Sequence, residues 1–238
     1  NYHIGSGQSS DSLAVGNREG VLDAQLDFAR ENSNIILEFK TKSKNIAHLL
    51  KTDIPDNVFV SWSLNPQVFI DHEEHGTASL DQRLSCAKSL SDKGVLVGFH
   101  FHPIVYYEGY EDDYKNIVNK VMSIFEPHQI AMISMGTLTF IKPAINKLRS
   151  AGLKSKVLQI PMVDAVGKSS YTKEVKAEIF SNVYNEFRAW HNDLFFYLCM
   201  EESSIWESVF GDFYKSNVDF ETALFESVSS KMKPLEIA

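Results

Sequence analysis

The stretch that decides the fold reads Val95-Leu96-Val97-Gly98-Phe99-His100-Phe101-His102-Pro103. Its first five residues form a short apolar run of the kind found in strands buried on both faces, and polar side chains follow where the run ends. The same pattern recurs in the apolar runs 34–39, 58–64, 130–134 and 194–199, with a weaker one at 157–160. A longer stretch with helical period follows most of these runs, and this alternation predicts right-handed strand–helix–strand units and a parallel sheet.

The intervening stretches carry helical patterns. Leu22, Leu26 and Ala29 share one face of the first. Ser79 and Gln82 have the spacing of a capping box at the start of another helix. Apolar stripes at helical spacing run over 114–125 and 171–187. We interpret each stripe as a helix face that packs against the sheet.

The sequence has five or six such units and no G-x-G-x-x-G after the first apolar run, which indicates an α/β barrel. We expect a partial (β/α)6-type barrel of parallel strands rather than a dinucleotide-binding fold. One domain is expected over residues 1–238, with 231–238 as a frayed tail. The most loop-like internal stretch is 163–173.

Composition narrows the class of protein. The chain has 238 residues, of which 44% are hydrophobic, and a formal net charge of −8. The acidic balance argues against unspecific nucleic-acid binding but leaves room for a local basic groove. No apolar run approaches the roughly 18 residues that a membrane span needs, and no signal peptide is present, so we expect a cytoplasmic protein without a membrane partner. The two cysteines, Cys86 and Cys199, are predicted to be buried thiols rather than a disulfide.

Polar residues collect where the predicted strands end, which is where parallel barrels carry their sites. These residues are Lys42, Ser63, Asn65, His100, His102, Thr137 and Glu201. Before the first apolar run lies the loop Gly5-Ser6-Gly7-Gln8-Ser9-Ser10-Asp11-Ser12. Its glycines permit close backbone approach and its N–H groups suit a carboxylate or ribose, although a plain helix-capping turn explains the loop equally well. Together these residues predict one polar mouth for a polar ligand.

His100 and His102 point to the same side of their strand because they are two residues apart. Three interpretations stay open for them. They could hydrogen-bond a ligand in the barrel, they could form a metal pair as in metal-dependent barrel hydrolases, or they could be structural. None of the other histidines is placed by spacing to complete a metal site.

Several blocks of sequence resemble one known family. In chain order they are 5–13, 37–43, 61–66, 74–84, 98–104 with 108–110, and 140–144. They resemble the glycine-rich Ser-Asp loop, the Thr-Lys strand and the later motifs of the spore photoproduct lyases and their relatives, a DNA-repair group of the radical S-adenosylmethionine superfamily. The blocks keep the family's order and span roughly residues 2–150.

The resemblance implies a lyase-like radical enzyme with two cofactors, S-adenosyl-L-methionine and a [4Fe–4S] cluster. One electron from the cluster would cleave S-adenosylmethionine to a 5′-deoxyadenosyl radical. By position, the cofactor's amino and carboxylate end would meet Gly5, Ser6, Gly7, Gln8, Ser10 and Asp11. Its carboxylate or ribose would meet Lys42, Ser63 and Asn65, while His100 and His102 would line the adenosine or substrate region. The substrate would be a DNA lesion or another nucleotide-related molecule.

The chain departs from the family in two ways. The C-x-x-x-C-x-x-C motif that holds the cluster is absent; in the family it precedes the glycine-rich loop by one strand and one helix. We therefore expect these cysteines upstream of Asn1, and expect the present chain to lack the first strand and cluster loop, to bind no cluster or other metal and to be inactive alone. Gln8 stands where the spore enzyme carries a hydrogen-donating cysteine, which favours a relative with another substrate. A metal-dependent hydrolase using His100 and His102 and a non-catalytic barrel scaffold remain the alternatives.

Overall fold

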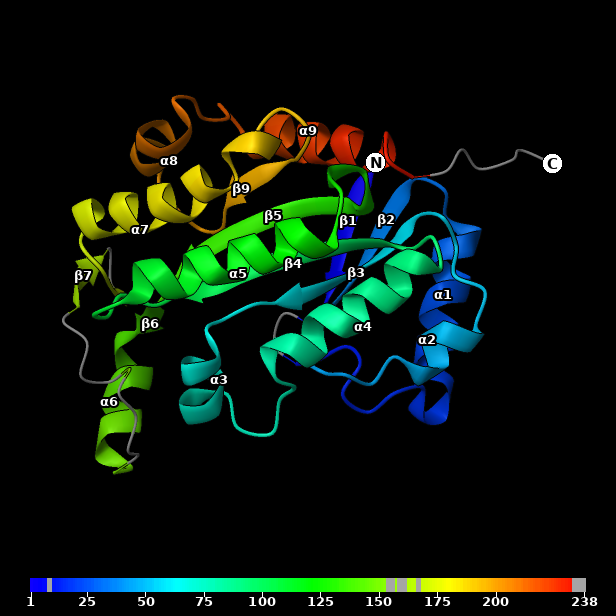
Figure 1. Cartoon of the computed structure of the whole chain (residues 1–238), viewed down its shortest axis with the longest axis horizontal. Helices are drawn as coiled ribbons and strands as arrows, with labels where there is room; N and C mark the ends of the chain where they lie inside the picture. Colours follow the sequence, from blue (N-terminus) through cyan, green and yellow to red (C-terminus); the bar gives the residue numbers. More distant parts are fainter. Residues whose placement is uncertain (8–9, 153–156, 158–161, 166–167, 233–238) are drawn as a thin grey trace.

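The computed structural model describes residues 1–7, 10–152, 157, 162–165 and 168–232. Its centre is a curled sheet of six strands in the order β1-β2-β3-β4-β5-β9, and every neighbouring pair is parallel (Figure 1). The strands are β1 (Tyr2–Ser6), β2 (Ile35–Thr41), β3 (Val58–Ser63), β4 (Leu96–Ile104), β5 (Ile130–Thr137) and β9 (Phe196–Leu198). This half-barrel confirms the predicted α/β fold.

Helices follow the strands and cover one face of the sheet. They are α1 (Val21–Glu31), α2 (Ala47–Lys51), α3 (Gln67–Glu73), α4 (Leu80–Asp92), α5 (Tyr110–Ile124) and α7 (Lys173–Glu186), with short 3-10 turns at Arg18–Gly20, Pro127–Gln129 and Arg188–Trp190. The predicted stripe of α1 is buried, and the capping box of α4 is formed with both of its hydrogen bonds. The larger apolar core lies between these helices and the outward-facing strand residues such as Phe39, Trp62 and Phe99.

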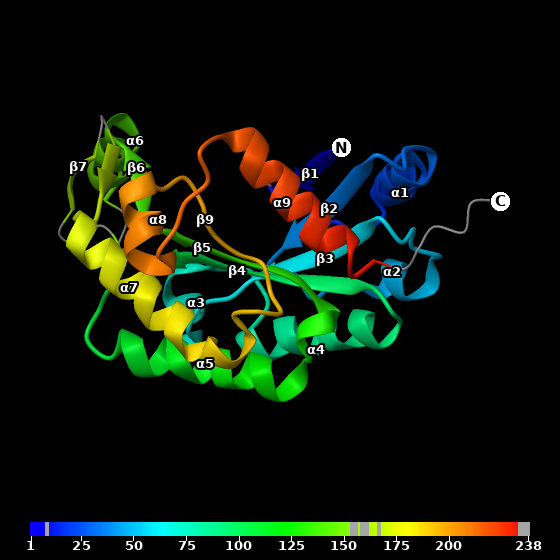
Figure 2. The ribbon, with the colours of Figure 1, turned by 90° about the horizontal axis from the view of Figure 1, so that it is seen from above.

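Two further helices, α8 (Ser203–Phe210) and α9 (Asn217–Ser229), come after the sheet. Helix α9 crosses one face of the sheet (Figure 2). Its residues Leu224 and Val228 pack against sheet residues that include Phe59 and Met132. Burying this second apolar cluster holds α9 across the amino-terminal half of the concave face. The concave face is left polar toward the carboxyl ends of the strands.

A small antiparallel sheet stands apart from the half-barrel. It consists of β6 (Thr139–Ile141), β7 (Val163–Ala165) and β8 (Lys168–Ser170) in the order β6-β8-β7, beside α6 (Lys142–Ser150). The prediction that 163–173 is a loop is therefore wrong, because β8 pairs with β6 and β7 pairs with β8 without any buried apolar run to mark these strands. Most of the weak run 157–160 lies outside the described residues.

Both ends of the described chain differ from expectation. Tyr2–Ser6 is an edge strand that the apolar runs did not predict, because its apolar side chains Tyr2 and Ile4 are exposed and no buried run marks it. At the other end, Lys231 donates hydrogen bonds to the carbonyl oxygens of Pro127, Ile130 and Asp193 at 2.8–3.1 Å. The predicted frayed tail therefore begins with an anchored residue, and 233–238 lie outside the described part. None of the described helices is long and apolar enough to cross a bilayer.

Candidate functional site

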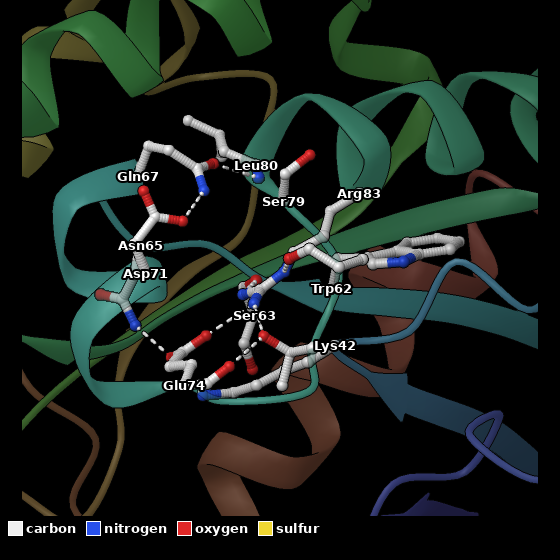
Figure 3. A network of polar contacts seen from close by, with 12 residues as sticks. Lys42, Trp62, Ser63, Asn65, Gln67, Asp71, Glu74, Ser79, Leu80 and Arg83 are labelled. Carbon is white, nitrogen blue, oxygen red and sulfur yellow. Dashed lines mark hydrogen bonds and ion pairs between the residues drawn. The ribbon is translucent and has the colours of Figure 1, made fainter.

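Glu74, which follows α3, is a buried carboxylate that gathers basic and amide groups around it (Figure 3). Its Oε1 accepts hydrogen bonds from Lys42 Nζ and, at 2.8 Å, from Asn65 Nδ2, and its Oε2 accepts one from Arg83 at 2.6 Å. We call these four residues the Glu74 network. Because Lys42 follows β2 and Asn65 follows β3, the network ties two neighbouring strand ends together.

Arg83 on α4 is completely buried, as is Asn65 in the same network. Its guanidinium also donates to the carbonyl oxygens of Ser63 at 2.7 Å and Ala78 at 2.9 Å. Burial raises the pKa of Glu74, but Lys42 and Arg83 outweigh that effect and lower it overall. Glu74 is thus a carboxylate held between two permanent cations.

The predicted site residues Lys42, Ser63 and Asn65 do lie together at the strand ends. Their surroundings are already occupied, however. Tyr114 donates to Asn65 Oδ1 at 3.0 Å, so both ends of the Asn65 amide have protein partners. The sequence pattern located these residues but could not show that Glu74, Arg83 and Tyr114 bind them.

The glycine-rich loop is fastened to the end of β2 by Asp11. Its Oδ1 accepts from the Leu13 N–H at 2.9 Å and from Thr41 Oγ1 at 2.6 Å, and its Oδ2 accepts from the Lys42 N–H at 2.7 Å. Asp11 therefore positions the loop. Gly5 and Ser6 lie on β1, Ser10 is exposed, and Gln8 lies outside the described residues.

Gly7 is where this loop presses closest on the sheet. Its φ is +87°, and a Cβ atom there would lie 2.6 Å from both the Lys40 carbonyl oxygen and Ser12 Oγ. Only glycine combines that backbone conformation with so close an approach. The loop thus lies directly over the backbone of Lys40.

A second buried carboxylate, Glu38 on β2, lies on the concave face. Its Oε1 accepts from Ser61 Oγ and contacts His100 Nε2 at 2.6 Å, while its Oε2 lies 3.0 Å from His3 Nε2. We call these four residues the Glu38 cluster. They come from β1, β2, β3 and β4, so the cluster crosses most of the half-barrel.

The charge of the Glu38 cluster follows from its burial. Burial raises the pKa of Glu38, but attraction and hydrogen bonding from His100 and His3 hold it well below its usual range. Burial also lowers the pKa of His100, against the attraction of Glu38. A neutral His100 that donates from Nε2 keeps Nδ1 as an acceptor, and Nδ1 is buried without a partner among the described residues.

Lys40 lies two residues after Glu38 and on the same side of β2. It is half-buried, and its ammonium forms no hydrogen bond with any residue of the described part. Burial lowers the pKa of Lys40, while the charges of Glu38 and Cys199 act in the opposite direction. Lys40 is therefore a cation at the mouth that lacks the ion pair Lys42 has.

His102 extends this polar surface toward β5 and β9. Its Nε2 lies 2.8 Å from Ser134 Oγ, and Ser134 also hydrogen-bonds Tyr197. The ring lies over Gly136, where a Cβ atom would come within 3.1 Å of it. Burial, together with the charges of His100 and Lys40, puts the pKa of His102 well below its usual range. His102 is thus a neutral ring at the mouth.

This geometry does not support a metal site formed by His100 and His102. The two rings meet edge to face with centroids 5.1 Å apart, and each has its own oxygen partner. Nowhere in the described chain do three His, Cys, Asp or Glu side chains form a group that could hold a metal ion. Cys86 and Cys199 are half-buried, not fully buried as predicted, because Cys86 lies near the α4 surface and Cys199 at the end of β9.

Sequence reasoning missed Glu38, Lys40 and His3. The pattern did hold an indication. Glu38 and Lys40 alternate with Leu37 and Phe39 inside a strand, and period-two charges in an otherwise apolar run place those charges on one inner face.

The comparison with family models decides the relationship. The spore photoproduct lyase model matches residues 4–161. The chain belongs to the spore photoproduct lyase family. Its match to the spore photoproduct lyase of Clostridium acetobutylicum is 27% identical over 111 residues, which cover 47% of this chain and 33% of that protein. A relative from Geobacillus sp. is 26% identical over 132 residues, covering 56% and 37%.

Solved structures of this family share the fold. A spore photoproduct lyase mutant with bound AdoMet and dinucleoside spore photoproduct superposes with a TM-score of 0.72 at 21% identity, covering 83% of this chain and 61% of that one. A second structure, complexed with dinucleoside spore photoproduct, gives a TM-score of 0.71. The chain spans about a third of the length of the curated relatives that it matches.

Proposed function

We propose that this chain is the cofactor- and substrate-binding half-barrel of a radical S-adenosylmethionine enzyme of the lyase type. The observation that carries the proposal is family membership over residues 4–161, the part that holds the loop, the Glu74 network and every member of the Glu38 cluster except His3. Relatives in this family are named spore photoproduct lyases, and one has been solved with AdoMet bound.

The residues at the mouth fit S-adenosylmethionine by their chemistry. The close approach at Gly7 brings backbone N–H groups to the strand ends, and Lys40 supplies a cation without an ion pair of its own. We assign the amino and carboxylate end to Gly5, Ser6, Gly7, Ser10 and Asp11, with Lys42, Ser63 and Asn65 beside them. The buried acceptor on His100 and the neutral ring of His102 face the rest of the ligand. On one-electron reduction by a [4Fe–4S] cluster, bound S-adenosylmethionine would supply a 5′-deoxyadenosyl radical for abstraction of a substrate hydrogen.

A [4Fe–4S] cluster does not fit the residues of this sequence. The two cysteines, Cys86 on α4 and Cys199 after β9, are in separate parts of the fold, and a cluster loop needs three thiolates. The thiolates that hold a cluster in this family are therefore not supplied by these two cysteines. We infer that this chain alone binds S-adenosylmethionine without cleaving it.

The substrate that we propose is a nucleic-acid lesion or a related nucleotide. Two structures of relatives contain dinucleoside spore photoproduct, which is a molecule of this class. The resemblance places Gln8 where the spore enzyme has a hydrogen-donating cysteine, and an amide has no readily transferable hydrogen atom. A lesion other than the spore photoproduct is therefore the substrate we favour.

Two measurements test the proposal. Calorimetric titration of the chain with S-adenosylmethionine should give saturable binding, and Gly7→Ala should weaken it at least tenfold because the new Cβ displaces the loop. Gly109→Ala is the matched control, since Gly109 has the same φ of +87° with nothing within 4 Å of its Cβ position. The full-length gene product, reconstituted with iron and sulfide, should release 5′-deoxyadenosine under dithionite. No product from a protein with an intact cysteine motif would refute the function.

A further inference from the structure

A cavity of about 350 Å³ lies at the β9 edge of the half-barrel. Tyr197 and Cys199 line it from β9 and its end, Trp206 from α8, Tyr214 from the connection between the helices, and Phe220 from α9. This volume falls in the range of small-ligand sites, roughly 300–1,000 Å³. Neither the Glu74 network nor the glycine-rich loop contributes to it.

The cavity adjoins the polar mouth. Tyr197 hydrogen-bonds Ser134, which in turn contacts His102. Tyr197 is also the register partner of Ser134 in the parallel β5–β9 pair, and Cys199 follows directly after β9. A ligand that extends from the mouth past β9 would therefore enter the cavity.

The walls of the cavity are aromatic faces with polar groups beside them. The Trp206 ring meets Tyr214 and Phe220 edge to face, with centroids 5.8 and 5.9 Å apart. Tyr214 and Phe220 also meet edge to face, with centroids 5.5 Å apart, so the three rings form one aromatic wall. Ser203 and Asn217 add hydrogen-bonding groups, which are suited to the edge of such a ligand.

The connection between α8 and α9 carries the sequence Asp212-Phe213-Tyr214-Lys215. Phe213 and Tyr214 are large apolar side chains with 41% and 37% of their surface exposed at the cavity. Exposed aromatic rings beside a lysine are the combination with which proteins stack the bases and neutralise the phosphates of single-stranded nucleic acid. Ordinary core packing does not account for rings that remain this exposed.

We propose that this cavity binds a nucleobase next to the reacting residue of a nucleic-acid strand. The base stacks on Trp206 and Tyr214 under Phe213, and Lys215 meets the adjoining phosphate. This inference rests on the proposed function, because it supplies the substrate side of the same mouth. The substrate that fits this cavity is a strand with unstacked bases rather than a free nucleotide.

Binding of a short single-stranded oligothymidylate to the chain tests the site. The oligomer should quench tryptophan fluorescence at low salt. Trp206→Phe should abolish the quench while anisotropy of a labelled oligomer still reports binding. Phe213→Ala should weaken binding roughly tenfold, and Lys215→Ala should weaken it and lower the salt slope by about 1. Val218→Ala is the control, since Val218 is exposed on α9 outside the cavity lining.

The site would be overturned if the parent chain does not bind the oligomer, or if Phe213→Ala binds it with the affinity of the parent. Loss of the quench when S-adenosylmethionine is added would also overturn it, because the cofactor's adenine would then occupy the cavity. Circular dichroism of each variant separates lost binding from lost folding. The proposed function fails separately, through the S-adenosylmethionine titration or the 5′-deoxyadenosine assay.

Discussion

Two buried glutamates at the same end of the sheet are handled in opposite ways. Glu74 is held by the Arg83 guanidinium and the Lys42 ammonium, and both ends of the Asn65 amide have protein partners. Glu38 is held by imidazoles, and one buried ring atom of His100 has no partner in the described chain. The difference teaches that the Glu74 network is a brace between strands, while the Glu38 cluster and Lys40 form a surface that can still accept a ligand and a proton.

The largest expected effect comes from breaking the brace. Arg83→Met leaves Glu74 buried opposite Lys42 alone and leaves the Ser63 and Ala78 carbonyls without their donor. We expect the free energy of unfolding to fall by about 3–5 kcal/mol, as for other buried ion pairs that lose one partner. Urea unfolding followed by circular dichroism measures it.

The control for this change is Lys120→Met, which removes the exposed Lys120–Asp81 pair. Its cost should stay below about 1 kcal/mol. If Arg83→Met costs no more than Lys120→Met, the Glu74 network is not a brace.

The two glutamates should also differ when each loses its charge. Glu74→Gln leaves a buried arginine without a carboxylate and should cost about 3–5 kcal/mol. Glu38→Gln leaves imidazole and hydroxyl partners rather than an arginine and should cost about 2 kcal/mol, the usual worth of hydrogen bonds to a charged group. Equal losses in urea unfolding at pH 7 would remove the distinction between the sites.

As the pH falls, folding stability should be lost first through the buried histidines of the concave face. The pKa of His102 is depressed in the folded state, so below about pH 6.5 the unfolded chain binds a proton that the folded chain does not, and stability falls by up to ~1.4 kcal/mol per pH unit. The pKa of Glu38 is also depressed, but its contribution is lost only below pH 4.5. Between these two pH values, protonation of histidines accounts for the loss of folding stability.

His102→Gln should therefore flatten the stability curve between about pH 6.5 and 4.5, while His75→Gln, at an exposed position, should leave it unchanged. Urea unfolding across this pH range measures both. An unchanged slope in His102→Gln would mean that the ring is solvated in the folded state.

The smallest effect is expected at Gly136. A Cβ atom there lies 3.1 Å from the His102 ring, so Gly136→Ala should push the ring off Ser134 and cost about 1 kcal/mol. In the double variant Gly136→Ala with His102→Gln the cost of the alanine should largely disappear, because the crowded ring is gone. A fully additive pair would show that the alanine acts elsewhere.

The half-barrel could be predicted from the sequence because its central strands are apolar runs and its helices have regular stripes, as for β4 and α1. The edge strand β1 could not, since one side of it faces solvent and no apolar run marks it. Lys42 and Asn65 were located by their place after strands. The roles of Glu38 and Lys40 could not be read, because a charge inside a strand takes its meaning from neighbours such as His3, which is 35 residues away from Glu38 in sequence.

The open sheet has a consequence for handling the protein. The outer edge of β1 pairs with no strand in the described chain, and Tyr2 and Ile4 are exposed there, 63% and 37% of their surfaces. Unpaired backbone groups beside exposed apolar side chains are a template for joining a second sheet edge to edge. Concentrated solutions of this chain should therefore self-associate through β1, and a lysine in place of Ile4 should keep it dispersed.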